Sequence, residues 1–250
     1  MHIDYRVFWV QKNGCQPEEY EDAFAPKEPF VGEVEQFRCA VCDGATETSF
    51  SGLWADILAQ AYVAADDNLA EQRATWTKSL AGKELPWYAE QKVAMGAFAA
   101  VSGLAIRERT TASGVRQIRW STRSLGDCCV FQVRGKYLLK ATPLADWQDF
   151  NNSPVLVSSI PGNDSELGDH LVEMDEKCRR GDIFYLLSDA IARWFLRVDQ
   201  EQDRAVALLE SVANQEDFDC LVSEQRSIKD KEGMPLMPND DVTFARVKVT

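Results

Sequence analysis

The sequence predicts an α+β protein in which helices pack against mostly antiparallel strands. Three observations lead to this fold class. Segments rich in β-branched and aromatic residues, bounded by turn residues, predict strands along most of the chain. Apolar residues at helical spacing follow Ser51 and return after Asp189. Neither an internal repeat nor a low-complexity linker is visible, so residues 1–250 are expected to form one domain.

The composition and net charge indicate which classes of binding partner the protein is not expected to have. The formal net charge is −13, with 45% hydrophobic and 27% charged residues, which is ordinary for a globular protein. This acidity argues against a nucleic-acid or anionic-membrane surface, because phosphate groups need clustered Lys and Arg. The N-terminal residues show no secretory signal, and no run of about 18 apolar residues predicts a membrane span. Seven cysteines without a disulfide spacing pattern indicate reduced thiols and a cytoplasmic protein.

The first strands lie in the N-terminal fifth of the chain. Residues 3–11 are rich in β-formers and end at Asn13-Gly14, a dipeptide that favours a tight turn. The acidic segment 17–26 is predicted to be a turn region. A short apolar strand, Phe37 to Cys42, then ends on Asp43-Gly44.

Two long helices are predicted next. Thr46, Glu47, Thr48 and Ser49 form a polar turn and are expected to cap a helix that begins near Ser51. Residues 83–86 break the helical pattern, and a second helix is expected to carry the apolar residues of 93–104 on one face. The two helices should form an antiparallel pair packed on a sheet.

The remaining chain alternates between strands and helices. Strands are predicted at 115–122, 128–133 and 136–141, and Arg134-Gly135 should turn the last two into a hairpin. Residues 143–180 are expected to form a surface excursion with one short strand at 155–159. A strand buried on both faces, 183–188, should precede a helix from Asp189. The last elements are helices at about 202–213 and 217–229 and a strand at 242–249.

One cysteine pair has a spacing that admits metal or redox chemistry. Cys39 and Cys42 are separated by two residues, as in half of a zinc site or in a redox pair. No second pair with this spacing exists, since Cys128 and Cys129 are adjacent. Residues three apart on an extended strand also point to opposite faces. Buried structural cysteines are therefore the favoured interpretation.

Carboxylates recur at the ends of the predicted strands. Asp43 and Asp189 each close an apolar strand, and acidic residues also stand next to three others: Glu21-Asp22, Asp127 and Asp240-Asp241. Each could be an ordinary turn former or helix cap. Five such positions together favour convergence, and converging carboxylates repel one another strongly. Because oxygen ligands suit Mg²⁺ and Mn²⁺, the pattern predicts one or two bound divalent cations.

The same residues resemble, in order, the motifs of the type 2C protein serine/threonine phosphatases. The motifs are Glu21-Asp22-Ala23, Asp43-Gly44, Gly126-Asp127, Ser188-Asp189 and Asp240-Asp241-Val242-Thr243. The resemblance extends from residue 21 to 249, and the variant Asp-Gly-Ala-Thr-Glu is similar to a bacterial branch. It implies a four-layer α-β-β-α sandwich, in which two antiparallel sheets are flanked by helix pairs.

The resemblance also implies roles for these residues. Asp43 would bridge two Mn²⁺ or Mg²⁺ ions, and the Gly44 carbonyl would join one of them. Asp189 and Asp240 would hold the first ion, and Asp22 would hold the second. The water attacking phosphorus would belong to the metals, so Asp43 and Asp22 are the implied catalytic residues.

Further positions are implied around this centre. Glu21 would support the second ion partly through water, and Asp127 is similar to the acid tied to a third metal in bacterial members. Asp241 stands where the family usually has Asn, and Ala190 where it usually has Gly. Ala45 replaces a histidine proposed as general acid in eukaryotic relatives.

The usual substrate-binding arginine is absent. Family members carry it some five residues before the equivalent of Asp22, where this chain has Pro17. Lys12 or Arg6, from the first strand, are the candidates to bind the substrate phosphate instead. The irregular segment 143–180 is similar in position to the family's variable flap and is expected to influence substrate choice.

The resemblance implies an Mn²⁺- or Mg²⁺-dependent phosphatase acting on phosphoserine or phosphothreonine in proteins. Its counterpart would be a Ser/Thr kinase in the same cell. Two alternatives stay open: a phosphatase-like binding or regulatory module with weak catalysis, favoured by Pro17 and Asp241, and a small-molecule phosphomonoesterase.

Overall fold

Two antiparallel sheets form the body of the structure, a computed structural model that describes residues 1–250 except 47, 83–86, 112–113, 152, 163 and 203. The side chains of residues 87–90, 164–166 and 201–202 are also outside the description. The first sheet has the strand order β3 (Phe30–Glu33), β1 (His2–Val10), β12 (Val242–Val249), β11 (Asp182–Leu187), β7 (Cys129–Arg134) and β8 (Tyr137–Thr142). The second has the order β10 (Val172–Cys178), β6 (Arg116–Leu125), β5 (Phe98–Thr110), β4 (Gln36–Gly44) and β2 (Asp22–Ala25), with β9 (Val157–Ser158) paired to β5.

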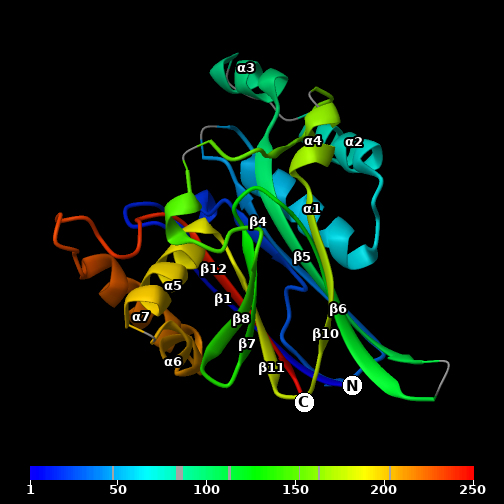
Figure 1. Cartoon of the computed structure of the whole chain (residues 1–250). Coiled ribbons are helices and arrows are strands. Elements are labelled where there is room, and N and C mark those ends of the chain that lie inside the picture. The colour runs from blue at the N-terminus through cyan, green and yellow to red at the C-terminus, as the bar shows by residue number, and fades with distance from the viewer. Residues whose placement is uncertain (47, 83–86, 112–113, 152, 163, 203) are drawn as a thin grey trace.

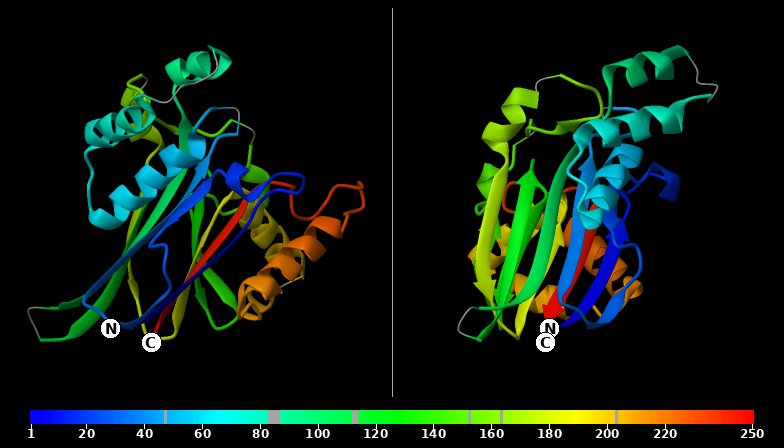
Figure 2. Two further views of the ribbon diagram at one scale, coloured as in Figure 1. Left: turned by 180° about the vertical axis from the view of Figure 1, so that it is seen from behind. Right: turned by 90° about the vertical axis from the view of Figure 1, so that its right-hand side faces the viewer.

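Helices cover the outer face of each sheet (Figures 1 and 2). On the second sheet lie α1 (Ser51–Ala64) and α2 (Leu69–Leu80), followed by α3 (Trp87–Met95). The first sheet is covered by α5 (Asp189–Gln202), α6 (Ala205–Glu210) and α7 (Gln215–Ser227). Shorter elements are α4 (Asp164–His170) and the 3₁₀ turns η1 (Pro17–Glu19) and η2 (Trp147–Asp149). None of the helices within the described ranges has the length and apolar character needed to cross a bilayer.

Three apolar layers hold these elements together. The central layer lies between the sheets and includes Cys39 and Val41 from β4 and Phe184 and Leu186 from β11. The outer layers join the first sheet to α5–α7 and the second sheet to α1 and α2. Alternate residues of a strand enter different layers, because successive side chains point to opposite faces. The expected α-β-β-α sandwich is confirmed.

The two spaced cysteines illustrate this alternation. Cys39 enters the central layer, whereas Cys42 packs in the layer beneath α1 and α2. Both thiols are unpaired and fully buried, and burial raises the pKa of each well above its ordinary value. The pair therefore packs as two apolar side chains in separate layers.

One helix approaches the second sheet unusually closely. A Cβ atom added to Gly103 on β5 would lie 2.2 Å from the ring of Tyr62 on α1. The tyrosine ring thus lies directly on backbone, and the guanidinium of Arg38, on β4, is 4.4 Å from the centre of this ring. The glycine lets α1 sit flat against the strands that carry the carboxylates.

The second predicted helix is wrong. The helical segment ends at Met95, and from Phe98 the chain forms β5, which is the centre of the second sheet. This strand is buried on both faces over most of its length, so its continuous apolar run fits a helical period as well as an extended one. The actual pair is α1 and α2, separated at Ala65, which has a left-handed backbone with φ of 57°. The predicted break at 83–86 lies outside the described residues.

Several short elements were also missed. Within the expected turn region, β2 forms from Asp22 to Ala25, and β3 follows it. The expected surface excursion contains α4 and β10, and β10 is an edge strand of the second sheet. The helix α1 starts after Phe50, which has a left-handed backbone and no side-chain cap, so the predicted capping is wrong for Thr46, Thr48 and Ser49; Glu47 lies outside the described residues.

Candidate metal centre

Two aspartates face each other across the second sheet. Asp22 is the first residue of β2, and its partner in the antiparallel register is Asp43, the penultimate residue of β4. Opposite residues on an antiparallel pair have Cβ atoms roughly 5 Å apart, and like charges in that arrangement destabilise a sheet. Asp22 is buried and Asp43 is partly buried, and desolvation is the main cause that raises the pKa of each well above its usual range. The sheet therefore presses together two groups that repel when ionised.

Three further aspartates reach the same place from the first sheet. Asp189 lies two residues after the end of β11, Asp240 lies two residues before β12, and Asp127 lies two residues before β7. These strands are antiparallel neighbours whose register brings the end of β11 beside the starts of β12 and β7. A cavity of about 430 Å³ results, lined by Asp43, Gly44, Asp127, Asp189 and Asp240. The predicted convergence of these acids from both sheets is present.

Mutual repulsion adds to burial in raising the pKa of these carboxyl groups. Burial first, and then the charges of Asp127 and Asp240, raise the pKa of Asp189 to about 7. Burial is also the main cause that raises the pKa of Asp127 to about 6, with Asp240 adding to it. No Lys or Arg is among the residues described as lining this cavity. Either protons or cations must offset the negative charge.

Oxygen donors of this kind fit hard divalent cations. One oxygen of Asp22, Oδ1, is buried and has no hydrogen-bond partner, which is unfavourable unless a cation or proton meets it. As the side chains stand, no three His, Cys, Asp or Glu residues in the described part of the chain are arranged to hold one ion. The residue types and their location thus fit a metal, while coordination would require small side-chain rotations.

Asp22 is held by two hydroxyl-bearing neighbours. Thr243 Oγ1 donates to Asp22 Oδ2 at 2.7 Å, and the Ser188 side chain also bonds to this carboxyl group. Thr243 in turn is joined to the Tyr20 hydroxyl. These bonds fix the orientation of the Asp22 carboxyl group and leave its Oδ1 atom without a hydrogen-bond partner. The motifs contain Ser188 and Thr243, but a role for either could not be read from sequence because it depends on cross-sheet contacts.

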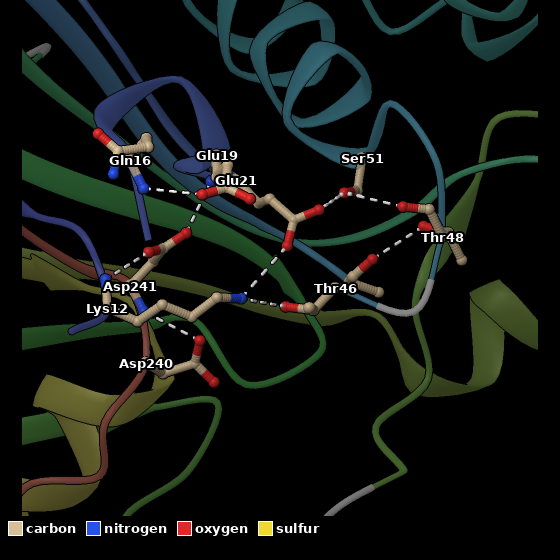
Figure 3. A network of polar contacts seen from close by, with 10 residues as sticks. Lys12, Gln16, Glu19, Glu21, Thr46, Thr48, Ser51, Asp240 and Asp241 are labelled. Atoms are coloured by element: carbon tan, nitrogen blue, oxygen red, sulfur yellow. Dashed lines mark hydrogen bonds and ion pairs between the residues drawn. The ribbon is translucent and has the colours of Figure 1, made fainter. Parts of the chain in front are cut away.

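A second polar network borders the cavity (Figure 3). Lys12 Nζ lies 3.2 Å from Thr46 Oγ1 and 3.7 Å from Glu21 Oε2. Glu21 Oε1 accepts a hydrogen bond from Ser51 Oγ at 2.6 Å. Burial lowers the pKa of Lys12, but the charges of Glu21 and the two neighbouring aspartates outweigh it, so the net shift is upward. An ammonium group therefore lies beside a cavity whose charged lining residues, as far as the structure describes them, are all acids.

Asp241 anchors the backbone of this network. Its Oδ1 accepts the backbone N–H of Lys12 at 2.9 Å, and its Oδ2 accepts the backbone N–H of Glu21 at 2.7 Å. The carboxylate thus ties the segment after β1 to the residue preceding Asp22. Each oxygen of the carboxylate accepts one backbone hydrogen bond. These bonds account for an aspartate at position 241 without a role in metal binding.

Gly44 is required by the close approach of three segments. A Cβ atom there would lie 2.7 Å from the backbone oxygen of Glu21 and 2.7 Å from backbone carbon of Ser51. The backbone N–H of Gly44 donates to that same Glu21 oxygen at 3.2 Å. Any side chain would push β4 away from the Glu21–Asp22 segment.

The other sequence candidates lie in different surroundings. Arg6 is in the middle of β1, is half exposed and binds Asp4 at 3.3 Å. It is six positions from Lys12 along the chain, roughly 20 Å where the chain is extended at 3.3 Å per residue. Pro17 opens the 3₁₀ turn η1 and has no side chain that could bind phosphate. The irregular segment supplies Ser153, Pro154 and Leu156 to the cavity lining.

Comparisons with known proteins give matches in structure and none in sequence. No protein-family model matches the chain, and no curated protein matches it. PppA of Pseudomonas aeruginosa, described as a key regulatory component of T6SS, superposes with a TM-score of 0.56 at 16% identity, covering 100% of this chain and 99% of that one. The Mycobacterium tuberculosis serine/threonine phosphatase PstP/Ppp gives 0.55 at 12% identity, covering 100% and 99%.

A further match is the catalytic domain of the serine/threonine phosphatase PstP, described in complex with two manganese ions. It has a TM-score of 0.51 at 13% identity, covering 99% of this chain and 100% of that one. At these identities the likeness concerns the fold. The shared feature is the pair of sheets enclosed by helices, with the acids of this chain at one end.

Proposed function

We propose that this chain, which has the fold of the type 2C protein phosphatases, is a metal-dependent phosphatase acting on phosphoserine or phosphothreonine in proteins. The observation that carries the proposal is the gathering of Asp43, Asp127, Asp189 and Asp240 around one cavity of about 430 Å³. Four carboxylates with no cation among the cavity's described lining suit divalent metal ions better than any other common ligand.

The proposed ligand set follows the placement of the acids. Asp43 is opposite Asp22 in the sheet register and interacts electrostatically with both Asp22 and Asp189, so it would be the ligand shared by two Mn²⁺ or Mg²⁺ ions. Asp189, Asp240 and the Gly44 carbonyl would hold the first ion, and Asp22 and Glu21 would hold the second. Asp127 would support a third ion. The bound cations would lower the pKa of a water and hold the phosphoryl oxygens for in-line attack.

Lys12 is the proposed phosphate-binding residue. Its ammonium group reaches Thr46, a residue of the cavity lining, and it is one-fifth exposed, so it is accessible to a substrate. It would stabilise the non-reacting phosphate oxygens as a point charge. Asp241 would position it by holding its backbone N–H. In this way a lysine supplies the charge that Pro17 lacks.

The proposed substrate is a phosphoprotein made by a Ser/Thr kinase in the same cell. The cavity is open, and its wall includes the irregular segment at Ser153 and Pro154, where a protein surface could dock. All seven cysteines are unpaired, which supports the cytoplasm as its compartment.

A weakly catalytic phosphatase-like module is the second candidate. The observation that favours it is the absence, among the described residues, of three acids already arranged around one ion. A module that binds a partner does not need its acids arranged around an ion. In a metal-dependent enzyme, the acidic side chains must change their positions when the metal binds.

The test is Mn²⁺-dependent hydrolysis of p-nitrophenyl phosphate and of a phosphothreonine peptide. We expect both substrates to be hydrolysed, EDTA to abolish the reaction, and Asp43→Asn to lower kcat by at least about 10²-fold, since the bridging charge is lost. Asp169→Asn, an exposed change on α4, is the matched control. A folded, Mn²⁺-binding wild type without activity would instead favour the module, and no Mn²⁺ binding would overturn both readings.

A further inference from the structure

A second, larger groove adjoins the candidate metal centre. It has a volume of about 860 Å³ and is formed by α5, by η2 and by the loop between α7 and β12. Figure 1 shows this loop next to α5 on one flank of the sandwich. We call it the basic groove, because Arg193, Arg197, Lys229 and Lys231 line it.

The basic groove and the candidate metal centre are lined by different residues of the same three segments. Along α5, Asp189 lines the metal cavity and Arg193 lines the groove. The segment before β9 contributes Pro154 to the cavity and Trp147 to the groove, and the segment before β12 contributes Asp240 and Pro238 in the same way. Three separate segments therefore contribute to both depressions, which places the groove near the cavity.

The charge of the groove is opposite to that of the molecule. Four basic side chains face only two acidic ones, Asp230 and Glu232, on a chain with a net charge of −13. Arg193 is partly exposed, and Lys229 and Lys231 are exposed. Within the described ranges, these three side chains have no hydrogen-bond or ion-pair partner. Unpaired basic charge on an acidic protein favours an acidic ligand.

The fourth basic residue, Arg197, has a structural role in the wall of the groove. The guanidinium of Arg197 donates to Asp230 at 2.8 Å and lies 4.9 Å from the ring centre of Trp147. Both side chains of the ion pair are largely buried. Arg197 thus joins η2 to the loop before β12 and keeps the groove open between them, leaving Arg193 and the two lysines to meet a ligand.

We propose that the basic groove binds acidic residues that flank the phosphorylated residue of a protein substrate. This inference rests on the proposed function of the metal centre. Asp189, Arg193 and Arg197 are four residues apart on one helix face, so the two arginines lie roughly 6 and 12 Å along the axis from Asp189. An extended peptide advances roughly 3.3 Å per residue. Acids about two to four residues from the phosphorylated residue therefore match the position of the groove.

The test compares three phosphothreonine peptides with the full chain in Mn²⁺: one with Ala on both sides, one with Glu at positions −4 to −2, and one with Glu at +2 to +4. The measured quantity is kcat/KM relative to the Ala peptide. We expect one of the Glu peptides to be preferred about three- to tenfold, the gain of one or two screened ion pairs. The preference should fall as ionic strength rises.

Variants test whether the preference for a Glu peptide depends on the basic groove. Lys229→Gln/Lys231→Gln and, separately, Arg193→Gln should each bring the ratio towards 1. Lys78→Gln/Lys177→Gln, which removes two exposed charges on α2 and β10, should keep the wild-type ratio. Equal hydrolysis of all three peptides by the wild type would overturn the inference while leaving the proposed function intact. So would a preference that survives in the groove variants or is lost equally in the control.

Failure of the proposed function would look different, because no peptide and no p-nitrophenyl phosphate would be hydrolysed. In that case the groove is tested by fluorescence anisotropy of a labelled Glu-rich peptide without phosphate. Binding by the wild type that weakens in the groove variants supports the groove. Absence of binding, or displacement by anionic lipid vesicles or RNA with higher affinity, contradicts a peptide as its ligand.

Discussion

Asp22 and Asp43 illustrate how a single register position sets the chemistry of the centre. They are opposite each other on neighbouring strands, and Asp22 Oδ1 has no partner. Sequence spacing predicted that acids converge, because each one stands at a strand end. It could not predict which acids are opposite, since β2 itself was taken for a turn.

Asp22→Asn should therefore stabilise the protein when no metal is present. The amide has the same shape, carries no charge and can donate to Asp43, while its oxygen can still accept from Thr243. In urea unfolding with EDTA at pH 8, we expect a gain of about 1–3 kcal/mol, the scale of relieving a buried unpaired charge. Mn²⁺ should stabilise this variant less than the wild type, because the proposed second ion loses a ligand. A loss of stability in EDTA would contradict the proposed repulsion.

Gly44 gives a test of packing around the same centre. Gly44→Ala places a methyl group against the backbone of Glu21 and Ser51, so we expect a loss of about 1–3 kcal/mol in urea unfolding, typical of overpacking. Gly162→Ala is the control, because nothing lies within 4 Å of a Cβ atom there. Equal stability of the two variants would show that β4 can move away freely.

At the scale of elements, an ion pair with a buried carboxylate fixes the pairing of β11 with β7 in the first sheet. Asp182 begins β11 and accepts hydrogen bonds from Arg134 Nε at 2.6 Å and Gln132 Nε2 at 2.8 Å, both on β7. Burial acts to raise the pKa of Asp182, but these bonds and one from the backbone of Arg179 lower it below the ordinary value of 3.8. The pair thus locks the register of β7 against β11, the two strands that deliver Asp127 and Asp189.

The lowered pKa has a defined effect on stability. Because the folded state holds this carboxylate ionised more strongly than the unfolded state, Asp182 stabilises the fold above about pH 3.8 and loses that effect as pH falls through its folded pKa. Asp182→Asn should cost about 1–3 kcal/mol at pH 7, the range for a charged hydrogen bond. The difference from wild type should shrink below pH 3.8 in urea unfolding; a constant difference would contradict the assignment.

The elements that sequence patterns missed share a physical cause. β5 is covered on both faces, so its apolar run carries no strand period, and β2 and β3 are only four residues long. Their identity comes from pairing with β4 and β1, which is tertiary information. In contrast β1, β11 and β12 were predicted correctly, because they combine β-branched or aromatic residues with clear turn signals.

At the scale of the whole molecule, the candidate metal centre draws its residues from both sheets. Asp22 and Asp43 belong to the second sheet, and Asp127, Asp189 and Asp240 to the first. Ions held between them would crosslink the halves of the sandwich. The order of the motifs along the sequence predicted this arrangement through the resemblance, whereas the contacts of Thr243, Ser188 and Lys12 depend on the assembled sheets.

Mn²⁺ should consequently stabilise the entire fold. At a concentration of 100 Kd, a ligand that binds only the folded state adds about 2.7 kcal/mol, or about 5–10 °C in Tm for a chain of this size. We expect this shift in thermal unfolding of the wild type and a much smaller one in Asp189→Asn. NaCl at matched ionic strength controls for screening. An equal shift in both proteins would place the ions elsewhere.

The central place of β12 in the first sheet has a consequence for biosynthesis. This strand lies between β1 and β11, although every other strand precedes it in the chain. During translation β1 and β11 must therefore wait, with unsatisfied backbone edges, until Val242–Val249 leaves the ribosome. The same strand is preceded by Asp240 and contains Thr243, so a polypeptide that stops before this strand lacks both the centre of its first sheet and two residues of the candidate metal centre.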